Sequence, residues 1–178
     1  LMGVKAGFLK ADVLAQPTGD LEDTTDNATV AQIVEAALLA TGASVTDVKL
    51  PSSEVLDKLN SLIGVLIDGG VRHDMVPYLT AAGAPVTTLE ELAAYNLQDP
   101  QVRIPKGQSE VDIALADPVM RDPEAYAQMT PGIKGALVET LDAAFADNQV
   151  DVLVSVNNYH SAQYATANYP AITVPLGK

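Results

Sequence analysis

The chain has 178 residues, enough for one ordinary domain, and 48% of them are apolar, so it can bury a sizeable core. Its formal net charge of −13 repels phosphate backbones and anionic lipids, so we expect neither nucleic acid nor membrane among its partners. The absence of cysteine excludes disulfides, thiolate nucleophiles and cysteine-based metal sites. No apolar run approaches the roughly 20 residues of a membrane span, and the first residues lack a signal-peptide pattern, so the expected compartment is the cytoplasm.

The first 50 residues predict a strand, a helix and a second strand. Residues 4–9 form a short apolar segment typical of a buried strand. Residues 30–38 place five apolar side chains on one helical face, and residues 44–50 are β-prone. A strand, a helix and a strand in this order usually form a right-handed parallel crossover. The residues expected to bound the helix are Asn27 or Thr29 as its N-cap and Gly42 as its left-handed stop.

The middle of the chain is predicted to be helical. We expect helices over residues 55–66, 73–82, 88–96 and 109–116. Gly69 and Gly70 end the first of them. Pro77 is tolerable in the second only if it belongs to the first turn. Residues 88–91, Thr-Leu-Glu-Glu, have the sequence of a capping box that opens the third. Residues 97–107 are expected to be a loop.

The last third predicts a helix, a strand, a polar loop and a final strand. Thr130 and Pro131 form an N-cap and first-turn pair that opens an amphipathic helix. Residues 150–156 are nearly all apolar, as expected of a strand buried on both faces, and residues 171–174 predict the last strand. These elements indicate the α/β class, with a single domain over residues 1–178.

A search for catalytic motifs finds no complete active site. The only two histidines, His73 and His160, lie in different predicted elements, so no metal site is expected. His160 follows a buried strand, where binding groups collect in α/β sheets, although an ordinary loop histidine is the stronger interpretation. Ser52 and Ser53 lack flanking glycines and are interpreted as helix caps. An acidic group in the surface loop over residues 17–27 lacks the glycine and glutamate of a calcium loop; it comprises Asp20, Glu22, Asp23 and Asp26.

Several segments follow one another in an order typical of one known family. Residues 169–177 read Tyr-Pro-Ala-Ile-Thr-Val-Pro-Leu-Gly, and residues 150–154 read Val-Asp-Val-Leu-Val. The supporting segments are residues 3–9, 41–51, 73–96 and 105–108. Together they resemble the amidase signature family, in which a D-x-L-V strand precedes a loop and then G-Y-P-A-I-T-V-P-x-G. The resemblance covers essentially the whole chain. It implies a partial amidase-signature fold, a mixed, mostly parallel sheet flanked by helices, with Val152 and Ile172 on neighbouring strands.

The resemblance also implies a chemistry. Amidase signature enzymes hydrolyse carboxamides through a Ser–cis-Ser–Lys triad, with backbone N–H groups holding the oxyanion, and need no metal or cofactor. The Gly-Gly-Ser-Ser-Gly-Gly motif of that triad is absent here, so no residue is assigned a catalytic role. Because both ends of the chain lie beside predicted strands, we expect an excised C-terminal part of an amidase. Such a part would wall the pocket of a small-molecule amide substrate, would not catalyse alone, and would self-associate through the surface left by the missing half.

The loop before residue 169 departs from the family pattern and leaves other functions open. Residues 155–157, Ser-Val-Asn, stand where the family usually has Ala-Pro-Thr, and Asn168 replaces a usual glycine. The residues expected to line the substrate pocket are Asn157, Asn158, Tyr159 and Gln163. Alternatively, these four only cap strand ends and turn the chain. A pseudoenzyme or complex subunit with a binding role is the second hypothesis, and a free-standing acidic α/β ligand-binding domain is the third.

Overall fold

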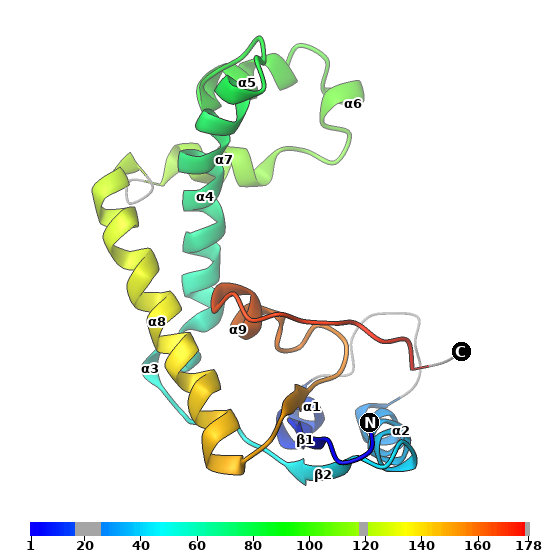
Figure 1. Ribbon diagram of the computed structural model, residues 1–178. Helices are drawn as coiled ribbons and strands as arrows, with labels where there is room; N and C mark the ends of the chain where they lie inside the picture. Colours follow the sequence, from blue (N-terminus) through cyan, green and yellow to red (C-terminus); the bar gives the residue numbers. More distant parts are fainter. Residues whose placement is uncertain (17–25, 118–120, 177–178) are drawn as a thin grey trace. The chain divides into compact units, whose positions relative to one another are not determined.

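The computed structural model describes residues 1–16, 26–117 and 121–176 (Figure 1). The predicted acidic loop therefore lies outside the described residues except at its end, where Asp26 and Asn27 are placed. The described strands are β1 (Lys5–Phe8), β2 (Ser44–Asp47) and β3 (Val152–Val154). The described helices are α1 (Lys10–Ala15), α2 (Asn27–Ala40), α3 (Glu54–Asp57), α4 (Leu59–Ala81), α5 (Leu89–Asn96), α6 (Pro100–Arg103), α7 (Ser109–Ala116), α8 (Pro123–Asn148) and α9 (Ser161–Thr166).

The chain divides into two compact units. The first, which we call the sheet unit, comprises Leu1–Asp57 and Lys134–Lys178 and contains the three strands. The second, the helical unit, comprises Lys58–Ile133. Helix α8 begins in the helical unit and ends in the sheet unit.

The sheet has the order β2-β1-β3, and both strand pairs are parallel. Ala6 on the central strand pairs with Val45 on one side and with Val152 on the other. The predicted α/β class, with a parallel sheet flanked by helices, is confirmed, and so is the parallel pairing of the first two strands. Gly7 on β1 allows close packing, because a Cβ atom there would lie 2.8 Å from the Val48 side chain.

The core of the sheet unit forms where β1 meets the helices that follow it. Phe8, Val13, Ala31 and Val156 are buried against one another and come from β1, α1, α2 and the segment after β3. A salt bridge of 2.7 Å between the Lys10 Nζ and a Glu35 carboxylate oxygen joins α1 to α2 at the surface. Helix α1 was not predicted, because its six residues are too few to display a helical repeat.

Two predicted helix boundaries are wrong, because α4 and α8 each continue through them. Helix α4 runs through Gly69, Gly70 and Pro77 without interruption. Gly69 leaves room for the ring of Tyr126, since a Cβ atom there would lie 2.2 Å from that ring. Helix α8 runs through Pro131, and the Thr130 hydroxyl, instead of capping a new helix, donates to the Tyr126 carbonyl at 2.9 Å.

The predicted final strand is also wrong. Residues 171–174 belong to no strand of the described sheet, and Ile172 is 90% exposed. Val152 and Ile172 are therefore not on neighbouring strands. β3 is an edge strand with Val152 half-exposed, so it is not buried on both faces. An apolar, β-prone segment becomes a strand only where an adjacent strand forms hydrogen bonds with its backbone N–H and C=O groups. The local sequence does not specify which strand that is.

Capping follows the sequence in some helices and departs from it in others. The capping box of Thr88 and Glu91 is present, and α5 ends at Asn96 as predicted. Gly42 has the predicted left-handed conformation, with φ of 82°. The N-cap of α2 is Asp26, which accepts from the Thr29 N–H at 2.8 Å, and neither Asn27 nor Thr29 caps this helix. Helices α6 and α9 lie within segments that were expected to be loops.

Candidate functional site

The candidate site lies in the sheet unit, where the chain leaves β1 and β3. These two strands are parallel neighbours, so the segments that follow them start at the same edge of the sheet. The Leu9 N–H donates to the Val154 carbonyl at 3.0 Å and fixes the two exits beside each other. In open α/β sheets, ligands bind outside the carboxyl ends of the strands. The predicted polar loop after β3 therefore begins at the edge where such a site is expected.

A serine, a histidine and an aspartate meet at this edge. Ser155 directly follows β3, and its Oγ lies 2.5 Å from Nδ1 of His160. The other ring nitrogen of His160, Nε2, lies 3.5 Å from a carboxylate oxygen of Asp12 on α1. His160 is only 6% exposed, whereas Ser155 and Asp12 are half-buried. The three side chains thus form a chain of polar contacts from the surface of α1 to the end of β3.

The carboxylate of Asp12 determines the direction of these contacts. An ionised carboxylate only accepts hydrogen bonds, so the proton of a neutral His160 belongs on Nε2, which faces Asp12. Nδ1 then presents a lone pair, and the Ser155 hydroxyl donates to it. Burial lowers the pKa of His160, and the nearby carboxylate of Asp12 opposes that shift in part. The neutral ring is therefore the favoured form at neutral pH.

Tyr159, one of the four predicted pocket residues, makes its contacts within the sheet unit. Its hydroxyl donates to Oδ1 of Asn27 at 3.1 Å, and its ring packs against the core around Phe8. The amide nitrogen of Asn27 in turn donates to the Gln16 carbonyl at 3.0 Å. This chain of contacts ties the loop after β3 to the start of α2 and explains why Asn27 is buried.

The other three predicted residues lie along the same loop and on α9. Asn157 and Asn158 are exposed, and Asn157 has a left-handed backbone with φ of 52°, which asparagine tolerates better than most residues. Gln163 is half-buried on α9, and its Oε1 is shielded from solvent without a hydrogen-bond partner among the described residues. The structure thus places all four residues on one continuous segment with His160. That they line a substrate pocket remains a prediction.

Asn168, at the end of this segment, stands where the family usually has a glycine. Its φ of 59° is left-handed, which glycine adopts freely and asparagine tolerates. Next to it, the Tyr169 hydroxyl donates to Asp142 on α8, and its ring stacks on Phe145 with centroids 5.9 Å apart. The hydrogen bond to Asp142 raises the pKa of Tyr169. The left-handed backbone at Asn168 is therefore one that a glycine in its place could also adopt.

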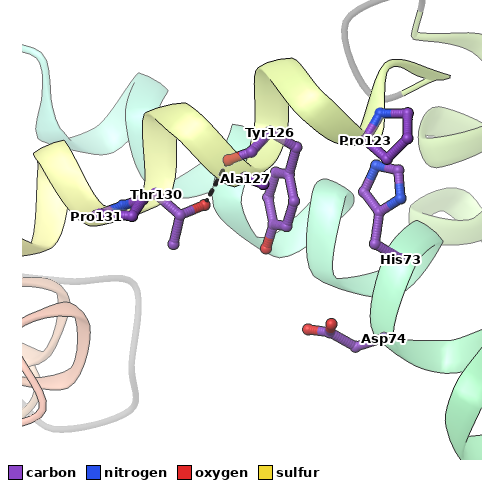
Figure 2. A pocket seen from close by; sticks show the side chains of 7 residues that line it. All are labelled: His73, Asp74, Pro123, Tyr126, Ala127, Thr130 and Pro131. Carbon is purple, nitrogen blue, oxygen red and sulfur yellow. Dashed lines mark hydrogen bonds between the residues drawn. The ribbon is translucent and has the colours of Figure 1, made fainter.

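The helical unit has an open groove of about 580 Å³ between α4 and the first part of α8. Figure 2 shows its lining, His73, Asp74, Pro123, Tyr126, Ala127, Thr130 and Pro131. The rings of His73 and Tyr126 stack with centroids 5.0 Å apart, and the Tyr126 hydroxyl donates to the Leu66 carbonyl at 3.3 Å. His73 is half-buried in this stack.

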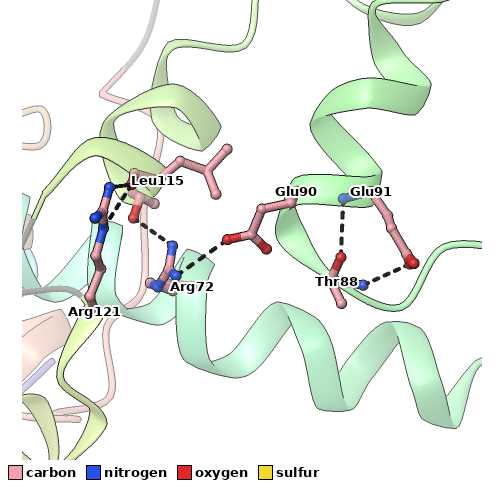
Figure 3. A network of polar contacts seen from close by, with 7 residues as sticks. Arg72, Thr88, Glu90, Glu91, Leu115 and Arg121 are labelled. Carbon is pink, nitrogen blue, oxygen red and sulfur yellow. Dashed lines mark hydrogen bonds and ion pairs between the residues drawn. The ribbon is translucent and has the colours of Figure 1, made fainter.

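Two arginines donate hydrogen bonds to backbone carbonyls at the carboxyl end of α7 in the same unit (Figure 3). Arg72 donates to the Ala114 carbonyl at 3.2 Å and contacts Glu90 on α5 at 3.4 Å. Arg121 donates to the Leu115 carbonyl at 3.0 Å. The last carbonyls of a helix lack intrahelical partners, so these contacts stabilise α7 and join it to α4 and α5. We assign this network to the packing of the helices.

The part of the chain that the structure describes has neither a metal-binding cluster nor a membrane-spanning helix. There, no three histidine or acidic side chains come together in an arrangement that could hold a metal ion. Among the same residues, no helix is both long and apolar enough to cross a membrane.

Sequence analysis singled out His160 but missed its partners Asp12 and Ser155 as a group. Asp12 is 148 positions away from His160 in the chain, and its segment was not predicted to be a helix. A signal was nevertheless present. Parallel pairing of the first and the next-to-last predicted strands would have brought the residues after each of them to one edge of the sheet.

Comparison with known proteins identifies the fold. No protein-family model matches the chain. No curated protein matches it in sequence. Among solved structures, an amidase family protein from Bacillus anthracis strain Ames matches with a TM-score of 0.68 and 23% identity, over 93% of this chain and 30% of that one. The native peptide amidase from Stenotrophomonas maltophilia matches with a TM-score of 0.68 and 22% identity, over 99% of this chain and 37% of that one.

A third solved structure, described as PAM12A, matches with a TM-score of 0.70 and 23% identity, again over 99% of this chain and 37% of that one. This chain thus spans about a third of the length of the solved structures it matches. The family suggested by the sequence motifs and the family of the matching structures agree. The chain therefore has the fold of one part of an amidase.

Proposed function

We propose that this chain is the substrate-side part of an amidase, a hydrolase that cleaves carboxamide C–N bonds. The observation that carries the proposal is the match of 99% of the chain to 37% of a peptide amidase. On this proposal, the catalytic Ser–Ser–Lys triad implied by the motifs lies in another part of a longer polypeptide. The present chain walls the substrate pocket and does not hydrolyse amides by itself, and the reaction needs no metal or cofactor.

The loop after β3 and helix α9 supply the proposed substrate contacts. The shielded Oε1 of Gln163 suits the N–H of a carboxamide, because a buried acceptor without a partner is costly and a bound donor would remove that cost. The exposed side chains of Asn157 and Asn158 offer both donors and acceptors. The hydroxyl of Tyr159 is held by Asn27, so its contribution to the pocket would be its ring.

A second function, a pseudoenzyme or complex subunit with a binding role, is favoured by one observation. Residues 155–157 replace the Ala-Pro-Thr that the family usually has at this point. The other departure, Asn168, does not support it, because its left-handed conformation is one that glycine also adopts. The two functions differ in turnover, since only an amidase releases an amine from a bound carboxamide.

The test compares the isolated chain with its full-length gene product on simple aliphatic and aromatic amides, with ammonia or amine release as the readout. We expect turnover by the full-length protein and none by the isolated chain. Turnover by the isolated chain would disprove the proposal that the catalytic triad lies in another part of a longer polypeptide. Amide binding without turnover by the full-length protein would favour the pseudoenzyme.

A variant of the full-length protein tests the substrate contact. Gln163→Ala is expected to raise KM with a smaller change in kcat, because it removes a binding contact that does not take part in bond cleavage. Gln128→Ala, at an exposed glutamine of α8, is the matched control and should leave both constants unchanged. An unchanged KM in Gln163→Ala would remove this residue from the pocket.

A further inference from the structure

We infer that Ser155 is an activated nucleophile, which His160 and Asp12 prepare for attack on activated acyl and phosphonyl groups. This reactivity is separate from the proposed amidase function, whose catalytic groups lie elsewhere. The inference rests on the juxtaposition of three side chains that three elements of the sheet unit bring to one edge of the sheet.

The first argument is the geometry of the proton acceptor. A serine hydroxyl becomes a nucleophile when a general base within hydrogen-bond reach takes its proton during attack. Nδ1 of His160 lies 2.5 Å from the Ser155 Oγ. The base is itself oriented by a third group, because Nε2 faces the Asp12 carboxylate at 3.5 Å. Nucleophile, base and orienting carboxylate are recognised by these roles and distances, not by their order in the chain.

The protonation state of His160 also suits a general base. A general base must be neutral before it acts, and burial among apolar groups disfavours the charged imidazolium. His160 is buried, and Asp12 selects the tautomer that carries its proton on Nε2. The lone pair of Nδ1 is therefore aimed at the hydroxyl that it would deprotonate. Asp12 would then stabilise the imidazolium that forms, as a carboxylate at contact distance does.

An electrophile must also be able to reach the Ser155 hydroxyl. Ser155 is half-buried and directly follows β3, and the next residues on its loop, Asn157 and Asn158, are exposed. Asn157 adopts a left-handed conformation, so the chain turns sharply within two residues of the serine. A serine on a sharp turn between a strand and a helix presents its hydroxyl at the end of the strand. We expect small electrophiles to reach the hydroxyl from this side of the loop.

The reaction balances without a further reagent. The Ser155 Oγ forms a bond to the carbonyl carbon of an activated ester, and its proton passes to Nδ1 of His160. The bond from that carbon to the phenolate oxygen breaks, and the phenolate leaves with the proton from Nδ1. With a fluorophosphonate, the bond from Oγ forms to phosphorus, fluoride leaves, and the proton passes from Nδ1 to solvent. Both reactions end at a covalent adduct on Ser155, and turnover is not part of the inference.

The test labels the 178-residue chain with a fluorophosphonate and separately with p-nitrophenyl acetate, and then locates the adduct by peptide mass spectrometry. We expect one adduct per chain, on Ser155. Ser155→Ala should lose it. His160→Gln should slow labelling about 100-fold, the lower end of what a general base contributes. Ser161→Ala, at a half-buried serine of the same segment, is the matched control and should label as the unmodified chain does.

A readout without substitutions keeps the test independent of folding. The labelling rate of the unmodified chain should fall as pH is lowered through the titration of His160, which nitrogen NMR follows in the same sample. NMR should also show the proton of neutral His160 on Nε2. No adduct on a folded chain, equal labelling of His160→Gln, or a proton on Nδ1 would overturn the inference. Failure of the full-length protein to hydrolyse amides would leave this result unchanged, so the two proposals fail separately.

Discussion

At the scale of single residues, His160 should control how the stability of the sheet unit depends on pH. Burial lowers its pKa in the folded chain below the ordinary value of 6.5. Between these two pKa values the unfolded chain binds the proton and the folded chain does not, so folding becomes less favourable as pH falls below about 6.5. The contribution of the neutral His160 ring to the unfolding free energy is therefore fully present above pH 6.5. It is lost as the pH falls towards the pKa of His160 in the folded chain.

Denaturant unfolding followed by circular dichroism at pH 7.5 and pH 5 measures this effect. We expect the unfolding free energy of the unmodified chain to fall more steeply between these values than that of His160→Gln, whose side chain does not titrate. Both proteins share every carboxylate, so the difference between their slopes isolates the histidine. Equal slopes would mean that His160 keeps its ordinary pKa in the folded chain.

Gly69 is a second residue whose importance comes from a single contact. The β-carbon of Gly69→Ala would lie 2.2 Å from the ring of Tyr126. That ring cannot move without losing its stack on His73 and its hydrogen bond to the Leu66 carbonyl. We expect Gly69→Ala to destabilise the helical unit by about 1–3 kcal/mol, as overpacking does.

The matched control is Gly64→Ala in the same helix, where a Cβ atom meets nothing within 4 Å. Alanine in a helix is favoured over glycine by up to about 1 kcal/mol, so this variant should be more stable than the unmodified chain. In urea unfolding, we expect Gly69→Ala to lower the unfolding free energy and Gly64→Ala to raise it. Destabilisation by both variants would indicate that α4 needs flexibility at its glycines.

At the scale of elements, α8 tests how much a helix loses to an internal proline. Pro131 is exposed and lies inside the helix, whereas Pro123 is its first residue. An internal proline removes a backbone hydrogen bond and costs up to about 3 kcal/mol relative to alanine, while a proline in the first turn costs little. Pro131→Ala should therefore raise helicity and unfolding free energy, and Pro123→Ala should change neither.

Circular dichroism at 222 nm and thermal unfolding measure both quantities. A loss of stability in Pro131→Ala would show that the packing of α8 depends on a bend at this proline. The prediction that Pro131 opens a new helix came from its pairing with Thr130, whose hydroxyl instead bonds one turn back along α8. Local capping patterns do not reveal whether the preceding turn is already helical.

At the scale of the whole molecule, we propose that apolar side chains on the last described segment supply a surface for self-association. Val174 is 75% exposed and lies two residues after Ile172, which is more exposed still. Residues 171–174 are exposed and β-prone yet pair with no described strand. Burial of such a surface between two copies is favourable, whereas the net charge of −13 opposes it.

Static light scattering over a range of concentrations tests this proposal. Association should increase when salt screens the charge, and Val174→Lys should reduce it. Val102→Lys is the matched control, since Val102 is also 75% exposed but lies on α6. A monomer at all concentrations, or equal effects of the two variants, would exclude the last segment as the associating surface.

The sequence by itself determined the α/β class and the parallel pairing of the first two strands, because both follow from the order of strands and helices along the chain. It also determined the capping box of α5 and the bounds of α7, because each depends on local periodicity or on a cap within one turn. Only the tertiary structure decided that α4 and α8 are continuous, that residues 171–174 form no strand, and that Asp12 and Ser155 meet at His160. Each of these depends on a partner far away in the chain. A residue's own neighbours specify its backbone preference, but they do not specify which distant side chain fills the space beside it or satisfies its polar atoms.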